Sequence, residues 1–292
     1  MTTGRLKSIF ITVYVAALFV AALHTLYMLV KSGFEWSWIG AAVALIPAAG
    51  FFTWLMVAEV ARTSPNLTAM LTAAYAGAGI SLIGWATAGP EALNPGLAFL
   101  YAAGIGAAGF SAYVFWYSRF GRGENTVLAV GKPLPDFVLE DIDGAIVTAK
   151  SFRGKPTLFM FYRGNWCPLC MAQINEVAEH YRELNEYGVD VALVSPQSHD
   201  NTRILASKFQ LPFHFLVDIE NRAATTLDIL SPDGTPWGMG VLGYEADTVL
   251  PTVIMTNAAG EVIFADLTDN YRVRPEPQVF LEIMRQKGGL AV

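Results

Sequence analysis

The sequence predicts two parts of different fold class: an all-α transmembrane module of four helices in residues 1–118 and an α/β domain in residues 131–292, joined by a linker at residues 119–130. Two observations predict this division. Charged side chains are scarce in the first part, and strand-like and helix-like patterns alternate in the second. The charged residues before Ser118 are Arg5, Lys7, Lys31, Glu35, Glu59, Arg62 and Glu91.

The first part contains four apolar segments, each about 20 residues long or slightly longer and free of Asp, Glu, Lys and Arg. Each is long enough to cross the hydrocarbon core of a bilayer as a helix. A secretory signal has a shorter apolar core, so we interpret the first segment as a membrane span. The segments are Ile9–Val30, Trp38–Ala58, Leu67–Ala88 and Leu97–Tyr117.

The distribution of Lys and Arg predicts the orientation of the spans. One side of the predicted module collects all basic residues near the span ends except Lys31, which lies on the other side. The positive-inside rule then places both termini, and the α/β domain, in the cytoplasm, with the chain a multi-pass protein of a plasma or inner membrane. The basic residues on the cytoplasmic side are Arg5, Lys7, Arg62, Arg119 and Arg122.

Charge and cysteine content exclude several classes of function. The chain has a net charge of −6 and shows no basic stripe, which argues against a nucleic-acid partner. Its 2 cysteines, Cys167 and Cys170, lie three residues apart, so neither a disulfide framework across the fold nor a four-cysteine zinc site can form. We expect no cofactor and no metal.

The second part alternates strands with helices, which predicts a sheet with helices packed on its faces. Towards the C-terminus, two strand-like runs flank the turn sequence of residues 257–260 and predict a β-hairpin, followed by a closing helix. The expected strands are 158–162, 189–194, 213–217, 252–256 and 261–266, and the expected helices are 167–187, 201–209 and 275–287.

The two cysteines directly follow an apolar strand and begin a helix, in the sequence Cys167-Pro168-Leu169-Cys170. The free N–H groups and the dipole at a helix N-terminus stabilise a thiolate, which is the nucleophile in thiol exchange. We therefore expect Cys167 to attack, with Arg163 adding positive charge, and Cys170 to resolve the product by closing an intramolecular disulfide. The alternatives are half of a zinc site and a pair of buried structural cysteines.

These residues carry a family resemblance. The run Trp166-Cys167-Pro168-Leu169-Cys170 after an apolar strand resembles the thioredoxin superfamily, and Leu250-Pro251-Thr252 resembles the cis-proline loop of that superfamily. The resemblance implies a thioredoxin-like fold in which Pro251 faces the dithiol. It also implies a substrate site formed by Trp166, Pro251 and the backbone of Leu250. The alternative is an ordinary trans proline at the start of a strand.

Within the superfamily, residues 131–137, 141–144 and 152–156 resemble the peroxiredoxin branch, the alkyl hydroperoxide reductase and thiol-specific antioxidant group. The resemblance covers roughly residues 130–287 and implies a thiol-dependent peroxidase or disulfide reductase. One position departs from the family. Typical peroxiredoxins place Thr or Ser three residues before the peroxidatic cysteine, whereas here that position is Gly164 for Cys167 and Cys167 for Cys170.

The sequence thus favours a membrane-anchored thiol-disulfide oxidoreductase. Its expected partners are a thiol reductant, either thioredoxin-like or of low molecular weight, a peroxide or protein disulfide substrate, and the lipid bilayer. A transmembrane electron carrier is an alternative that requires a cofactor on His24, and a redox-sensing interaction module is another. The long stretch 231–249 is either a lid that covers the dithiol with Trp237 or Met239, or a surface excursion.

Overall fold

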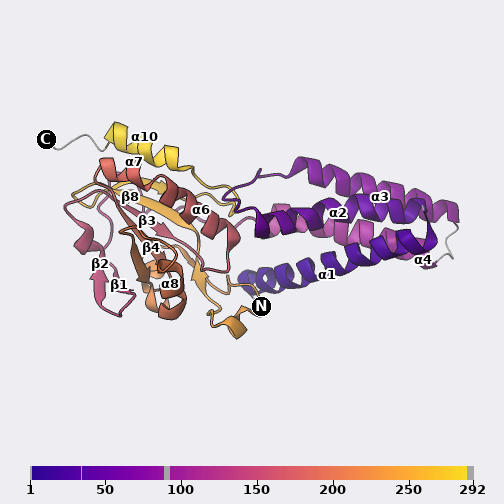
Figure 1. Cartoon of the computed structure of the whole chain (residues 1–292), viewed down its shortest axis with the longest axis horizontal. Coiled ribbons are helices and arrows are strands. Elements are labelled where there is room, and N and C mark those ends of the chain that lie inside the picture. The colour runs from indigo at the N-terminus through magenta and orange to yellow at the C-terminus, as the bar shows by residue number, and fades with distance from the viewer. Residues whose placement is uncertain (1, 34, 89–92, 288–292) are drawn as a thin grey trace. The chain divides into compact units, whose positions relative to one another are not determined.

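The computed structural model describes residues 2–33, 35–88 and 93–287 (Figure 1). The chain folds into two compact units. The helical unit comprises Ile9–Ala58 and Thr63–Arg119. The α/β unit comprises Met1–Ser8, Glu59–Arg62 and Phe120–Val292.

Four helices in the described residues are long and apolar enough to cross a membrane, as the sequence predicted. The first three are α1 (Thr3–Ser32), α2 (Trp36–Val57) and α3 (Thr68–Ala88). The fourth candidate span, Asn94–Tyr117, begins in α4 (Leu93–Leu100) and continues through two π-helical stretches on either side of α5 (Phe110–Ala112). Each candidate is identified by its length and composition.

Small residues allow α2 and α3 to approach closely. A Cβ atom built on Gly77 would lie 2.5 Å from the carbonyl oxygen of Gly40 and 2.5 Å from the backbone nitrogen of Ala44. Apolar helices that cannot use the hydrophobic effect between them gain their stability from such close packing. His24 of α1 has a hydrogen-bond partner within this unit, because its Nδ1 atom lies 3.2 Å from the hydroxyl of Tyr101.

The α/β unit is built on a seven-stranded mixed sheet with the strand order β2-β1-β5-β4-β3-β8-β9. Strands β3, β4 and β5 are parallel neighbours, while the outer strands pair antiparallel. A second, two-stranded sheet pairs β6 (Leu230–Ser231) with β7 (Thr248–Val249). The strands of the main sheet are β1 (Val138–Asp141), β2 (Ile146–Thr148), β3 (Thr157–Phe161), β4 (Asp190–Ser195), β5 (His214–Val217), β8 (Thr252–Thr256) and β9 (Val262–Asp266).

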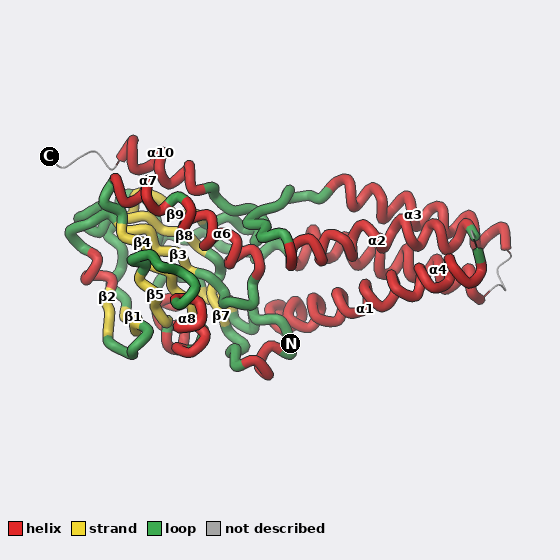
Figure 2. The backbone as a smooth tube through the Cα atoms, in the orientation of Figure 1, coloured by secondary structure: helices red, strands yellow, loops and turns green. Residues whose placement is uncertain are grey.

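Helices cover both faces of this sheet, with α6, α7 and α10 on one side and α8 on the other (Figure 2). The single helix expected over 167–187 is interrupted at His180, whose ψ of 8° takes it out of the helical region. The helices of the unit are α6 (Pro168–Glu179), α7 (Tyr181–Glu186), α8 (His199–Ala206), α9 (Arg222–Thr226) and α10 (Pro277–Lys287).

The dithiol lies at the edge of the sheet where the parallel strands end. The parallel strands β3, β4 and β5 end at the same edge, which is where α/β sheets present their functional loops. The residues of β3 and β8 are all buried, so the centre of the sheet forms a rigid support for the loop that follows β3.

An aromatic cluster holds the centre of this sheet. The side chain of Phe159 is 1% exposed and packs edge-to-face against Phe137 and Phe152. We expect Phe159→Ala to lower the free energy of unfolding of the α/β unit by about 3–5 kcal/mol, through lost burial and the cavity left behind. Urea unfolding of the full chain in detergent measures this. As the control, Val138→Ala removes a side chain that is 46% exposed, and an equal loss there would contradict the assignment of the core.

Candidate active site

The dithiol lies where the sequence placed it, between the end of β3 and the first turn of α6. Cys167 is the N-cap residue of α6, and Pro168 occupies the first helical position, where its missing N–H costs nothing. The two Sγ atoms are 2.8 Å apart, both thiols are free, and their residues are 2% and 0% exposed. The pair is thus a buried thiol–thiol contact at a helix N-terminus.

The geometry explains why a hydroxyl residue is absent from the loop before Cys167. Gly164 has a φ of 142°, and a Cβ built there would lie 2.9 Å from the indole ring of Trp166 and 3.2 Å from the ring of Tyr244. Thr or Ser therefore does not fit at this position. Relative to Cys170, the position three residues earlier is Cys167 itself, whose thiol makes the contact with the Cys170 sulfur.

A buried arginine that the sequence analysis missed lies beside the inner thiol. Arg274, in the segment between β9 and α10, places its Nη2 atom 3.5 Å from the Sγ atom of Cys170. Its guanidinium is fixed by further hydrogen bonds, from Nη1 to Oε1 of Gln173 at 2.8 Å and from Nε to the carbonyl of Tyr271 at 3.0 Å. A cation with its donors arranged in this way stabilises negative charge on Cys170.

The ionisation of the two thiols is therefore unequal. Burial raises the pKa of Cys170, but the hydrogen bond with Cys167 and the positive charge of Arg274 outweigh burial and lower this pKa to about 5. The hydrogen bond with Cys170, followed by burial, raises the pKa of Cys167 well above its usual range. We expected the thiolate on Cys167, but the charge of Arg274 lowers the pKa of Cys170 and so favours a thiolate there.

Arg163 lies beside the dithiol as the sequence suggested. Its guanidinium carbon is 4.7 Å from the centroid of the Trp166 ring, and Nη2 donates to the carbonyl of Gly234. Its charge lowers the pKa of both thiols, although less than that of Arg274 does. Its carbonyl accepts a hydrogen bond of 3.1 Å from the hydroxyl of Thr248, which fixes the loop from a second strand.

Gln197, at the end of β4, supports the loop from the other side. Its Oε1 atom accepts a hydrogen bond of 2.9 Å from the backbone N–H of Asn165, and its Nε2 atom donates to Oδ1 of Asn165 and to the hydroxyl of Tyr162, both at 3.0 Å. These contacts fix the backbone that leads into Cys167. No local signal marks Gln197 in the sequence, because its role depends on two neighbouring strands ending at one edge.

The prediction of a cis-proline was wrong, because the peptide bond between Leu250 and Pro251 is trans. A trans bond carries the extended chain from β7 into β8, and the N–H of Leu250 donates to the carbonyl of Ile229 at 2.7 Å. The carbonyl of Pro251 accepts a hydrogen bond of 2.6 Å from Arg122. Pro251 also lines a small hollow of about 10 Å³ together with Gln173 and Arg274.

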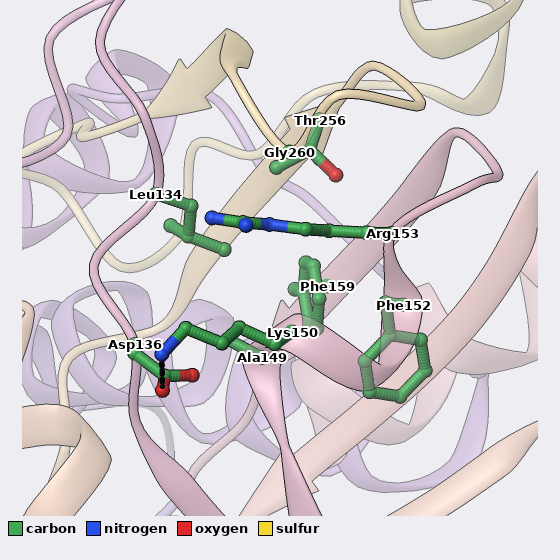
Figure 3. Close-up of a pocket in the computed structure, with 9 residues that line it drawn as sticks. All are labelled: Leu134, Asp136, Ala149, Lys150, Phe152, Arg153, Phe159, Thr256 and Gly260. Carbon is green, nitrogen blue, oxygen red and sulfur yellow. Dashed lines mark ion pairs between the residues drawn. The ribbon is translucent and has the colours of Figure 1, made fainter.

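Two further hollows lie in the α/β unit. A groove of about 540 Å³ lies next to Gln197 and is lined also by His199, Glu220 and Glu245. A second pocket contains none of the predicted site residues, and there Lys150 pairs with Asp136 at 2.7 Å below the side chain of Arg153 (Figure 3). Among the described residues, no group of three or more His, Cys, Asp and Glu side chains is arranged to hold a metal ion.

A dithiol at the start of a helix, directly after a central strand of a mixed sheet, defines a thiol redox domain of thioredoxin-like fold. Residues 130–265, which lie within the α/β unit, match the model of the AhpC/TSA family. This confirms the resemblance seen in the sequence.

Individual relatives match this domain only in part. Chloroplastic peroxiredoxin Q of Populus jackii is 30% identical over 102 residues, which are 34% of this chain and 48% of the relative. The thiol-disulfide oxidoreductase ResA of Bacillus cereus is 29% identical over 114 residues, which are 39% of this chain and 62% of the relative. The chain therefore spans about half to two thirds of the length of these relatives.

Solved structures that resemble the chain include peroxidoxin BcpB from Mycobacterium tuberculosis, at 15% identity and a TM-score of 0.44. This match covers 54% of the present chain and 97% of the other. AhpC of Enterococcus faecalis matches at 17% identity and a TM-score of 0.44, covering 56% and 98% of the two chains.

The role of Arg274 in thiol ionisation can be measured directly. We expect the ultraviolet absorbance of the thiolate to titrate with a midpoint near the Cys170 pKa of about 5 in the wild type. Arg274→Gln removes the positive charge, which destabilises the thiolate and raises the midpoint by roughly 1–3 units. Arg274→Lys keeps the charge and is the matched control. Equal midpoints in the wild type and Arg274→Gln would contradict the assignment.

Proposed function

We propose that this chain is a membrane-bound, thiol-dependent oxidoreductase that reduces hydroperoxides with the dithiol of Cys167 and Cys170. The observation that carries the proposal is the buried sulfur pair, 2.8 Å apart, with the guanidinium of Arg274 held 3.5 Å from the Cys170 sulfur. A nucleophilic thiolate and a resolving thiol are thereby already within bonding range of each other.

Cys170 is the first nucleophile in this proposal, in place of Cys167, because the arginine and the thiol hydrogen bond both favour its thiolate. Its sulfur attacks the terminal oxygen of a hydroperoxide, the O–O bond breaks, and the alkoxide leaves and takes a proton from solvent. Cys170 becomes a sulfenic acid. The Cys167 thiol then attacks that sulfur, the S–S bond forms, and the hydroxyl leaves with the thiol proton as water.

A reductant must complete the cycle. A thioredoxin-like protein or a low-molecular-weight thiol returns two electrons and two protons to the disulfide by thiol–disulfide exchange. Trp166, Leu250 and Pro251 form the proposed substrate side of the site, where Pro251 and Arg274 line the same small hollow. Arg163 contributes positive charge next to both sulfurs.

The burial of the dithiol favours a small peroxide over a protein disulfide as substrate. Both cysteines are at most 2% exposed, and a disulfide on another protein must bring its sulfur into line with the attacking thiolate. Reduction of protein disulfides is the second candidate, because the sequence is also similar to ResA, a thiol-disulfide oxidoreductase.

The helical unit supplies the membrane part of the proposal. The four candidate spans support a multi-pass protein in a plasma or inner membrane, and the basic residues near the span ends favour a cytoplasmic α/β unit. The hydrogen bond between His24 and Tyr101 accounts for a polar side chain inside a span without a cofactor. This observation favours an anchor over a transmembrane electron carrier.

The two cysteines have different expected phenotypes. Cys170→Ser removes the nucleophile, and we expect peroxide consumption by the full chain to fall on the order of 100-fold or more. Cys167→Ser leaves the nucleophile without its resolving thiol, so a sulfenic acid accumulates on Cys170 and is trapped by a dimedone reagent followed by mass spectrometry. Trapping on Cys167 in Cys170→Ser, with peroxide consumption retained, would reverse the assignment.

Membrane integration and orientation have a separate test. We expect the full chain to stay in the membrane fraction after an alkaline wash and to be released by detergent, because four apolar spans hold it there. A protease added to sealed vesicles with the cytoplasmic face outward should digest the α/β unit. Protection of that unit in the same vesicles would overturn the cytoplasmic orientation, and release by alkali would overturn the anchor.

A further inference from the structure

The loop between β6 and β7 exposes three large apolar side chains. Trp237 is 63% exposed, Val241 is 91% exposed and Leu242 is 64% exposed. We call these three residues the apolar loop tip. They lie on or beside a short 3-10 turn, Met239–Leu242. Clustered exposed apolar residues on a folded protein mark interaction sites more often than scattered ones do.

The tip is held on a fixed base. The N–H of Thr235 donates to the carbonyl of Ala246 at 3.0 Å, which closes the loop below the tip. The carbonyl of Gly234 accepts a hydrogen bond from Arg163, which ties the same base to the loop of the dithiol. The 63% exposure of Trp237 favours a surface excursion over a lid for this part of the stretch 231–249.

Short stretches of chain connect the α/β unit to the first and fourth candidate spans. The fourth candidate span ends at Tyr117, and the N–H of Phe120 already donates to the carbonyl of Asp269 within the α/β unit at 2.8 Å. The three Cα–Cα steps from Tyr117 to Phe120 span about 11 Å at most. At the other end, the boundary between the units falls between Ser8 and Ile9, with no linker.

The residue at that second boundary also contacts the loop. Within the α/β unit, the hydroxyl of Ser8 donates to the carbonyl of Thr235 at 2.6 Å, and the N–H of Trp237 donates to the carbonyl of Ser8 at 3.2 Å. Ser8 immediately precedes the apolar run that begins at Ile9. The base of the loop is thus hydrogen-bonded to the residue immediately before the first apolar run.

We propose that the apolar loop tip inserts into the headgroup region of the bilayer in which the helical unit is anchored, an inference that rests on the membrane part of the proposed function. The ring of a tryptophan is suited to this interface, and transfer of Val241 and Leu242 out of water is favourable. Asp233, Glu245 and Asp247 flank the tip, and their carboxylates are repelled by anionic lipids. Insertion is therefore driven by apolar contact and does not require anionic lipids.

Fluorescence of the full chain in lipid nanodiscs tests this insertion. The chain has 7 tryptophans, so the contribution of Trp237 is the difference between the emission of the wild type and that of Trp237→Phe. We expect this difference emission to be quenched by phosphatidylcholine brominated near the headgroup and to be little affected by aqueous iodide. Leu242→Ser should raise iodide quenching of Trp237 by weakening insertion.

Controls separate this inference from the proposed function. Trp237→Phe should keep the far-ultraviolet circular dichroism and the peroxide consumption of the wild type, because Trp237 is outside the dithiol site. Difference emission that is quenched by iodide and unaffected by bromine would place the tip in water and overturn the insertion. If that result is obtained while the chain still resists alkaline extraction, the membrane anchor of the proposed function is supported and only the insertion of the loop tip is refuted.

Discussion

The contact between the two sulfurs, with a buried arginine beside the inner one, is the interaction on which the site depends. A thiolate in a buried position is stable only when its charge is compensated, and the guanidinium of Arg274 lies 3.5 Å from the Cys170 sulfur, where it can supply that compensation. The sheet and its loops serve this arrangement. Strand β3 and α6 bring the cysteines together, whereas the segment after β9 brings the cation from 104 positions further along the chain.

The same arrangement accounts for the departure from the typical peroxiredoxin pattern. A hydroxyl residue is sterically excluded at Gly164, where the backbone has a positive φ and the Trp166 ring leaves no room for a Cβ. Cys167 takes the position three residues before Cys170, and its sulfur lies in hydrogen-bond contact with the Cys170 sulfur at 2.8 Å. In the proposed cycle, this same side chain is the resolving thiol.

The sequence predicted the elements whose signals are local. The apolar spans, the alternation of strands and helices, and the dithiol after β3 all follow from runs of neighbouring residues. Arg274 and Gln197 carried no such signal, because each reaches the site from a different segment through tertiary contacts. The prediction of which cysteine forms the thiolate was limited in the same way. The helix N-terminus, a local signal, favours a thiolate on Cys167, whereas Arg274, distant in sequence, favours one on Cys170. The expectation of a cis peptide bond before Pro251 rested on a family resemblance. In the extended chain between β7 and β8 this bond is trans.

In the proposed cycle, Cys167 and Cys170 act together as one two-electron redox centre. Titration of the reduced full chain in detergent with hydrogen peroxide, followed by mass spectrometry of its peptides, tests this pairing. We expect one equivalent of peroxide to convert both thiols into an intramolecular Cys167–Cys170 disulfide, which a dithiol reductant reverses. Free thiols that persist after one equivalent, or oxidation of a single cysteine without a bridge, would contradict it.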